Sequence, residues 1–248
     1  MAGRTGKREF DQIRNTNIKT EVQDFADGSA LIEMGKTRVI TTATIEEKVP
    51  FFIKGQGSGW IKAEYSMLPR STETRTQRDR GPRMSGRTQE IQRLIGRSLR
   101  AVTDLNDLGE RTIIIDCDVL QADGGTRCAS ITAGCVSLAL ALKKLMDNDL
   151  LQCMPLRNLA GAVSVGVVEE DLLLDLDYSE DSSASLDMNV VGTDDKSLVE
   201  VQVSSEKEPF SKDVFTSLLD LSLKGIKELI RIQKEALKEQ SPLFIAYE

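Results

Sequence analysis

The sequence predicts an α+β fold in which mixed β-sheets are packed with helices. The first observation is that runs of β-branched and alternating residues precede a long apolar helical segment. The second is that this order occurs twice, on either side of residues 154–158. The third is an ordinary globular composition, with 40% hydrophobic and 29% charged residues. We therefore expect two similar halves, residues 1–155 and 156–248, that form one compact unit.

The first half predicts a hairpin, further strands and two helices. Two β-rich runs within residues 30–47 flank a short Gly-Lys turn, and glycines 55, 57 and 59 then mark a loop before a strand at 60–68. Residues 88–104 have helical spacing, and residues 112–120 are β-rich. Residues 130–146 are apolar on nearly every side, which predicts a buried helix.

The second half repeats this order with four strands and a final helix. The strands are expected at residues 160–168, 172–178, 186–191 and 197–203. The second and third are expected to be joined by an acidic, serine-rich turn. Ser211 then caps the start of a long helix whose apolar residues recur at helical spacing.

Composition excludes several kinds of chemistry. The chain has no histidine, so a Ser-His-Asp or Cys-His nucleophile and a histidine-ligated metal are excluded. The four cysteines include no Cys-x-x-Cys pair, which argues against a zinc site and favours a reduced, cytoplasmic setting. The longest apolar run, residues 135–142, is too short to cross a membrane, so we expect no membrane association.

The charge is distributed unevenly along the chain. Residues 70–100 contain nine arginines and no lysine against three acids, although the net charge of the whole chain is −7. Residues 169–208 contain thirteen acids against two lysines. Guanidinium groups match phosphate oxygens, so the arginine cluster fits phosphate or RNA binding. A solvated helix face or an arginine-rich subunit interface explains the charge about as well.

A glycine bend between a strand and a helix is a candidate phosphate site. In residues 121–132, Gly124 and Gly125 precede Thr126 and Arg127, with the helix expected to begin near Ser130. Glycines allow a close backbone approach, and amides at a helix N-terminus attract anions. A tight turn with an exposed arginine is the simpler interpretation of these residues alone.

Three further groups of residues could take part in chemistry. Arg87 precedes the helix at 88–104 and could reach a phosphate there, or it could be an ordinary surface arginine. Asp181 and Asp187 bracket the acidic turn and could hold Mg²⁺, which typically takes one or two carboxylates with substrate phosphates. A solvated acidic turn is the alternative. Asp116 and Asp118 share one face of a strand and are interpreted as structural.

Four long motifs resemble one family. They are KGQGSGWIKAEYSMLPRST, SGRTQEIQRLIGRSLRA, LGERTIIIDCDVLQADGGTR and LLDLDYSEDSSASLDMNVV. The chain resembles the bacterial ribonuclease PH family of phosphorolytic 3′–5′ exoribonucleases from about residue 8 to residue 237. The resemblance implies two β-α-β halves of the ribosomal protein S5 domain 2-like type, and a homohexameric ring built as a trimer of dimers.

The resemblance also implies a nucleotidyltransferase reaction. Inorganic phosphate, as co-substrate, attacks the terminal linkage of single-stranded RNA 3′ ends and releases a nucleoside diphosphate. Transfer-RNA precursors are the expected substrates, with ribosomal RNA as a further one. The implied roles are phosphate binding by Arg87, Gly125, Thr126 and Arg127, catalysis by Arg127, Asp181 and Asp187, binding of Mg²⁺ or Mn²⁺ by Asp187 and Asp181, and RNA binding by Arg70, Arg75 and Arg78.

Departures from the family pattern leave other interpretations open. Cys128 replaces a usual threonine, Ser185 replaces a common glutamate, and residues 203–207 differ from the usual Gly-Thr-x-Glu-Gly sequence. Cys128 could be a thiol made acidic by Arg127, or a buried inert residue. A ring subunit of the exosome or polynucleotide phosphorylase type is one alternative for the chain. The other is a catalytically silent RNA-binding subunit of an exosome-like ring.

Overall fold

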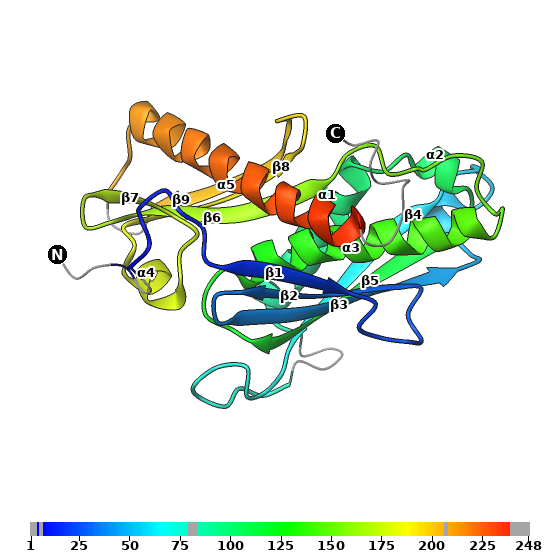
Figure 1. The fold of residues 1–248 in the computed structure, drawn as a ribbon, viewed down its shortest axis with the longest axis horizontal. Coiled ribbons are helices and arrows are strands. Elements are labelled where there is room, and N and C mark those ends of the chain that lie inside the picture. The colour runs from blue at the N-terminus through cyan, green and yellow to red at the C-terminus, as the bar shows by residue number, and fades with distance from the viewer. Residues whose placement is uncertain (1–3, 5–6, 79–83, 206–207, 239–248) are drawn as a thin grey trace.

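The computed structural model describes residues 4, 7–78, 84–205 and 208–238, which form two β-sheets packed with helices (Figure 1). The long helix α3 (Thr126–Asp147) lies between the sheets, and α5 (Lys212–Lys238) covers the second sheet. The α+β prediction with a sheet and a long helix in each half is thus confirmed in the described part of the chain.

The first sheet has five strands in the order β1-β2-β3-β5-β4. The strands are β1 (Thr16–Thr20), β2 (Gly28–Met34), β3 (Thr37–Glu46), β4 (Trp60–Met67) and β5 (Thr112–Gln121). The predicted hairpin is β2–β3, and Gly35 accommodates its turn with a φ of 58°. Strands β4 and β5 are parallel and are connected through α1 (Gly86–Ala101) and the short α2 (Leu105–Leu108). A 3₁₀ turn, η2 (Phe51–Ile53), precedes β4.

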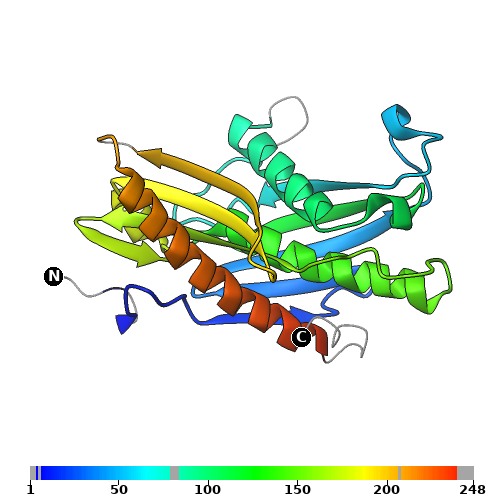
Figure 2. The same ribbon diagram turned by 90° about the horizontal axis from the view of Figure 1, so that it is seen from above.

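Helix α3 forms the centre of the molecule. Figure 2 shows it extending beyond the C-terminal end of α5 and along the first sheet, and most of its residues are buried. By length and hydropathy alone this helix could cross a membrane, but 89% of that window is buried inside the fold. Such burial on all sides explains why its sequence has no polar face.

The second sheet is antiparallel, with the order β7-β6-β8-β9. Its strands are β6 (Ala160–Val168), β7 (Asp171–Leu174), β8 (Leu186–Thr193) and β9 (Leu198–Ser205). The predicted cap of α5 is confirmed, because the Ser211 Oγ accepts a hydrogen bond from the Val214 amide at 3.2 Å. The buried Gln233 of α5 donates to the carbonyls of Thr132 and Ala160, both at 2.8 Å, and so joins α5 to α3 and β6.

The acidic turn predicted between residues 178 and 186 is wrong, because a short helix occupies it. Strand β7 ends at Leu174, and α4 (Tyr178–Ser183) follows. The Asp177 carboxylate accepts from the Glu180 amide, and the Glu180 carboxylate accepts from the Asp177 amide, each at 3.0 Å. This reciprocal capping box satisfies two amides that a helix start leaves unpaired. Strand β1 and helix α2 were also not expected from the sequence.

Candidate active site

The glycine bend joins β5 to α3 as predicted, but the helix begins earlier. It starts at Thr126, with Gly125 as its N-cap, so Thr126 and Arg127 belong to its first turn. Gly124 and Gly125 have φ values of 75° and 67°. A Cβ on Gly124 would lie 2.7 Å from the Leu176 carbonyl oxygen, and one on Gly125 would lie 2.8 Å from Arg14 Nη2. Both glycines are therefore required by conformation and by space.

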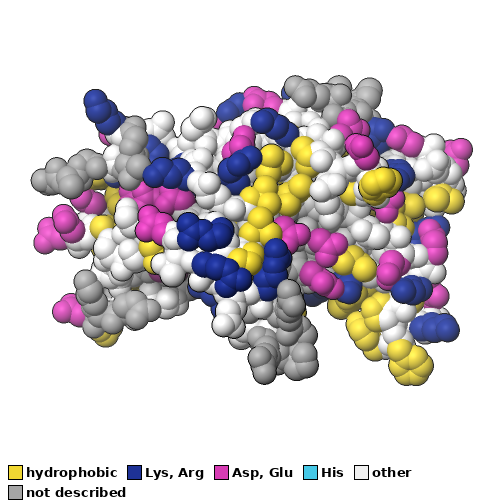
Figure 3. Space-filling model, turned by 90° about the horizontal axis from the view of Figure 1, so that it is seen from below, with side chains coloured by type: hydrophobic (Ala, Val, Ile, Leu, Met, Phe, Trp, Pro, Cys, Tyr) yellow, Lys and Arg dark blue, Asp and Glu magenta, His cyan; other side chains and the backbone are white. Residues whose placement is uncertain are grey.

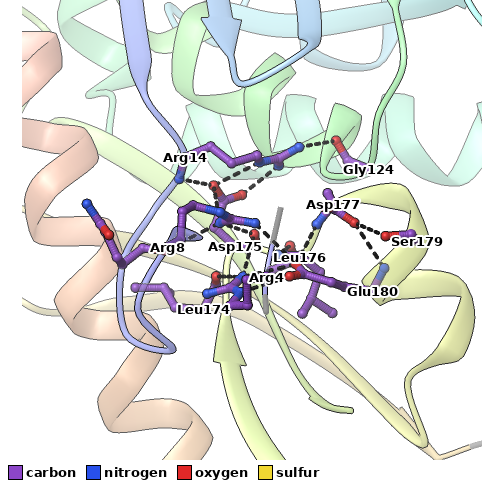
Figure 4. A network of polar contacts seen from close by, with 12 residues as sticks. Arg4, Arg8, Arg14, Gly124, Leu174, Asp175, Leu176, Asp177, Ser179 and Glu180 are labelled. Carbon is purple, nitrogen blue, oxygen red and sulfur yellow. Dashed lines mark hydrogen bonds and ion pairs between the residues drawn. The ribbon is translucent and has the colours of Figure 1, made fainter. Parts of the chain in front are cut away.

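Arg14 holds the carbonyl side of this bend (Figure 4). Its Nη1 donates to the Asp123 carbonyl at 2.6 Å, and the Thr37 hydroxyl donates to the Gly124 carbonyl at 2.7 Å. Arg14 also forms a two-point ion pair with Asp175, through Nη2 at 2.6 Å and Nε at 3.0 Å. These hydrogen bonds to its backbone carbonyls thus hold the bend in place.

Two further arginines of the N-terminal segment join the same network. Arg4 Nε donates to Glu180 at 2.8 Å, and Arg8 Nη2 contacts Glu180 at 3.2 Å. Arg4 also donates to the Leu174 carbonyl at 2.7 Å. These contacts tie Arg4 and Arg8 to β7 and α4 of the second half (Figure 4).

Thr126 is held by a tyrosine from the first sheet. The Tyr65 hydroxyl on β4 lies 2.9 Å from Thr126 Oγ1, and both residues are buried. Burial raises the pKa of Tyr65, while the Thr126 hydrogen bond and the charges of Arg87 and Arg127 oppose this rise. Both arginines therefore lie close enough to act on this hydroxyl pair.

Arg127 is oriented by a neutral side chain rather than by an acid. Its Nη1 donates to Gln202 Oε1 on β9 at 3.2 Å. The Gln202 Nε2 in turn donates to Glu200 at 3.2 Å and Glu90 at 3.4 Å. Because an amide oxygen does not neutralise a guanidinium, the positive charge of Arg127 remains available to an anion.

The charges of the other predicted site residues Asp181, Arg127 and Arg87 all act on Asp187. Burial and the negative charge of Asp181 raise its pKa to about 6. The charges of Arg127 and Arg87, and the Asn189 Nδ2 hydrogen bond at 3.0 Å, act in the opposite direction. The fold therefore brings the first turns of α1 and α3 together with α4 and β8, although these elements are far apart in the sequence.

This arrangement can bind an anion beside two carboxylates. Arg87, Arg127, Thr126 and the amides of the α3 N-terminus supply positive charge and donors, as phosphate binding requires. Asp181 and Asp187 are oxygen ligands of the kind that Mg²⁺ prefers. Among the described residues, no group of three or more metal-ligating side chains is present, so any cation here would need ligands from substrate or water.

The three arginines predicted to bind RNA are exposed on the segment between β4 and α1. Arg70 donates to the Glu73 carbonyl at 2.7 Å, and Arg78 lies near enough to Asp118 to oppose the rise in its pKa. Part of this arginine-rich segment, residues 79–83, lies outside the described residues. Figure 3 shows basic side chains gathered around a strip of apolar side chains on the lower face of the molecule.

Cys128 is a buried inert thiol rather than an activated one. Burial raises its pKa to about 12, which outweighs the opposing charge of Arg127. Its Sγ donates to Asn189 Oδ1 at 3.5 Å. Asn189 therefore links Cys128 to Asp187. The thiol of Cys128 makes this structural contact at the position where a threonine would offer a hydroxyl.

A large groove elsewhere is not the site predicted from the sequence. It measures about 1740 Å³ and lies between residues 7–16 and α5, and its lining contains neither Arg127 nor Asp187. The predicted site residues come together instead around Asp187, where charged groups of both signs lie near the N-terminus of α3.

The sequence interpretation missed four supporting residues: Arg14, Tyr65, Asn189 and Gln202. Alternation along the strands places Asn189 on the same face as Asp187, and that signal was readable. Arg14 and Tyr65 give no such local signal, because each acts on residues more than sixty positions away.

The fold and the site define a class of protein in which an anion can be held beside a pair of carboxylates. The chain matches the family model "3′ exoribonuclease family, domain 1" over residues 12–144 and "domain 2" of the same family over residues 158–225. It is 56% identical to a ribonuclease PH of Moorella thermoacetica, with 94% of each chain covered. It is 53% identical to one of Bdellovibrio bacteriovorus, covering 95% of this chain and 97% of the relative.

The chain therefore belongs to the 3′ exoribonuclease family, and its activity is that of a phosphorolytic 3′–5′ exoribonuclease. A structure of the Archaeoglobus fulgidus exosome with RNA bound to the active site has the same fold, with a TM-score of 0.78. That structure is 24% identical, and the match covers 93% of this chain and 92% of the other. The predicted S5 domain 2-like fold is confirmed by this likeness.

Proposed function

We propose that this enzyme trims the 3′ ends of transfer-RNA precursors, with ribosomal RNA as a second substrate, in the cytoplasm. An oxygen of inorganic phosphate attacks the phosphorus of the last phosphodiester linkage. A new P–O bond forms, the bond to the 3′ oxygen breaks, and that oxygen takes up a proton. The products are a nucleoside 5′-diphosphate and an RNA that is one nucleotide shorter.

Orthophosphate is held by Arg87, Gly125, Thr126 and Arg127 in this proposal. The main barrier to the reaction is the approach of one anion to another. Two guanidinium groups and the helix N-terminus offset that repulsion and hold the attacking oxygen in position. The support is that Arg127 contacts a neutral amide in the described structure, so its charge is not already satisfied.

Asp187 and Asp181 are the ligands for Mg²⁺ or Mn²⁺ in this proposal. Asp181 raises the pKa of Asp187, so the two carboxylates repel each other and a divalent cation would stabilise them together. A cation held there supplies positive charge to the oxygens of the transferring phosphorus. Asp187 also accepts a hydrogen bond from Asn189, which orients its carboxylate.

Arg70, Arg75 and Arg78 bind the backbone of single-stranded RNA 3′ ends in this proposal. All three are exposed. Contacts of this kind depend on charge rather than on base edges, so the enzyme is expected to show little sequence preference. A duplex end hides the terminal linkage, which explains the preference for single strands.

We further propose that the chain assembles into a hexameric ring, a trimer of dimers. The family motifs in the sequence support this arrangement. Phe51, with 93% of its surface exposed, and Phe52, with 60%, also leave apolar area uncovered in the single chain. Light scattering of the purified protein, or analytical ultracentrifugation, measures the mass directly. A monomer at micromolar concentration would contradict the ring.

The observation that carries the proposed function is the effect of three charged groups on one carboxylate. Arg87, Arg127 and Asp181 all act on Asp187, and the same two arginines act on the Tyr65–Thr126 pair. A silent RNA-binding subunit would need basic groups for the RNA but no second anion site beside two carboxylates.

An RNA with a labelled 3′ nucleotide tests the proposal. We expect label to be released as nucleoside diphosphate only when inorganic phosphate and Mg²⁺ are present. Release of monophosphate without added phosphate would indicate a hydrolase. Binding of RNA without any release would indicate the silent subunit. A precursor transfer RNA with a 3′ extension, compared with a mature one, then tests the substrate class.

A further inference from the structure

We propose that Tyr65 is a positioning residue that turns the hydroxyl proton of Thr126 toward the bound orthophosphate. The inference rests on the proposed function, because it assigns a role within the phosphate site. Tyr65 lies on the first sheet and is not among the residues that the sequence predicts to bind phosphate.

The hydroxyl groups of Tyr65 and Thr126 form a close and isolated pair. Their oxygens are 2.9 Å apart, and the two residues are 4% and 8% exposed. In the part of the chain that the structure describes, neither hydroxyl has a second hydrogen bond. Strand β4 therefore contacts the first residue of α3 at the point where that helix begins.

The direction of this hydrogen bond decides what Thr126 can offer a ligand. Either oxygen could be the donor when the two groups are alone. An unprotonated phosphate oxygen accepts hydrogen bonds, so Thr126 must direct its single proton outward to bind it. That proton is free only if Thr126 accepts from Tyr65. A tyrosine at this position thus converts an ambiguous hydroxyl into a donor aimed at the anion.

The surroundings keep the phenol protonated and place it at the site. Burial is the largest influence on Tyr65 and raises its pKa, and the Cys117 thiol acts in the same direction. The positive charges of Arg87 and Arg127 act against this rise, so both side chains lie near enough to influence the phenol. The hydroxyl pair is therefore beside the same two arginines that are proposed to bind phosphate.

A purely structural role is the competing explanation, since the bond also ties β4 to α3. The two roles differ in what they affect. A structural tie would change stability, kcat and RNA binding together. A positioning role changes the affinity for phosphate and leaves RNA binding alone.

Tyr65→Phe removes one oxygen and keeps the buried ring. We expect the KM for inorganic phosphate to rise about threefold to tenfold, the range set by loss of one hydrogen bond. The KM for RNA is expected to stay within error of the unsubstituted enzyme. Tyr178→Phe is the matched control, because the Tyr178 side chain is 66% exposed and the chemical change is the same.

A double-mutant cycle tests whether Tyr65 acts through Thr126. Thr126→Val removes the hydroxyl that Tyr65 is proposed to direct, and Thr126→Ser keeps it. We expect Tyr65→Phe to raise the KM for phosphate in the Thr126→Ser background and to have no further effect in the Thr126→Val background. Additive effects in the Thr126→Val background would show that Tyr65 does not act through Thr126.

A binding measurement without turnover gives a second readout. Inorganic phosphate is expected to raise the melting temperature of the unsubstituted enzyme more than that of Tyr65→Phe at the same concentration. If Tyr65→Phe does not fold, 3-fluorotyrosine at position 65 replaces it. That residue keeps the hydroxyl as a stronger donor, so the KM for phosphate should not rise, and a rise would overturn the inference.

The outcomes separate this inference from the proposed function. If the unsubstituted enzyme releases no nucleoside diphosphate, the proposed function fails. If it does release diphosphate and Tyr65→Phe leaves the KM for phosphate unchanged, the positioning role fails alone. A loss of kcat and RNA binding with an unchanged KM for phosphate would assign Tyr65 a structural role.

Discussion

Two groups of arginines in this molecule have the same side chain and opposite surroundings. Arg4 and Arg14 in the N-terminal segment are buried, at 8% and 5% exposure, and each pairs with a carboxylate of the second half. Arg87 and Arg127 lie in the first turns of helices, and neither forms an ion pair with a described carboxylate. The first group joins parts of the fold, and the second leaves its charge for a ligand.

The difference shows that the partner, rather than the residue type, decides what an arginine does. A buried guanidinium that lost its acid would be very costly, so Arg14 and Asp175 are best understood as one unit. Arg127 is held by Gln202, which orients it without cancelling its charge. The acids follow the same division, because Asp175 is paired with Arg14 whereas Asp187 has a pKa raised to about 6.

Arg14→Ala is the change that should disrupt the buried group most. It leaves the Asp175 carboxylate buried without its main partner, and it releases the carbonyl of Asp123. We expect the free energy of unfolding at neutral pH to fall by about 3–5 kcal/mol. Urea denaturation followed by circular dichroism measures this. Arg231→Ala, which removes an exposed helix ion pair, is the control and should change stability little. An equally small effect of Arg14→Ala would end the distinction between the two groups.

Arg127→Ala should have the converse effect. We expect phosphorolysis to fall by about 10²–10³-fold, because a charge aimed at the reacting anion is lost. The melting temperature should stay close to that of the unsubstituted enzyme, since the hydrogen bond that Arg127 makes to a described side chain is to a neutral amide and not to an acid. Initial rates at limiting phosphate measure the loss. Arg157→Ala is the control, because Arg157 pairs with Asp104 on the exposed surface. Unchanged activity of Arg127→Ala would contradict the phosphate site.

Asp187→Asn tests whether the partly buried charge of Asp187 costs stability. Its folded pKa is raised from 3.8 to about 6, so the folded state favours the protonated carboxyl. The stability that this proton provides is present below about pH 4 and is lost as the pH rises through 6. We therefore expect Asp187→Asn to increase the free energy of unfolding by about 1–3 kcal/mol at neutral pH without divalent cations.

The size of that stability difference should depend on pH and on added cation. The difference between the variant and the unsubstituted protein should shrink as the pH falls toward 4, where both side chains are neutral. Adding Mg²⁺ should stabilise the unsubstituted protein and not Asp187→Asn. Thermal unfolding from pH 4 to pH 8, with and without Mg²⁺, measures both trends. A variant that is less stable at every pH would show that the Asp187 charge is fully compensated.

The combined change of Arg70, Arg75 and Arg78 to alanine should have the smallest effect on the folded protein. We expect weaker RNA binding and a logarithmic salt dependence that is less steep by about 2, from the loss of three phosphate contacts on a single strand. Fluorescence anisotropy with a labelled oligonucleotide across several salt concentrations measures the slope. An unchanged slope would show that these arginines do not contact the RNA backbone.

Much of the fold could be predicted from local sequence. The Gly35 hairpin, the buried helix α3 and the Ser211 cap each follow from residues within a few positions of one another. Helix α4 was missed even though Asp177 and Glu180 form a readable capping box, because the acidic and serine-rich composition suggested a turn. Strand β1 was missed because Thr16–Thr20 is short and lies at the edge of its sheet.

The glycine bend, the residues that follow it and the excess of arginine nearby can all be predicted from the local sequence. These features depend on backbone conformation and on side-chain chemistry, which are properties of neighbouring residues. Which arginines are paired with acids, and which remain available to a ligand, depends instead on the packing of distant segments. Tyr65 reaches Thr126, and Arg14 reaches Asp175, across 61 and 161 positions of chain. Such contacts depend on how the sheets and helices pack, and no pattern of neighbouring residues predicts them.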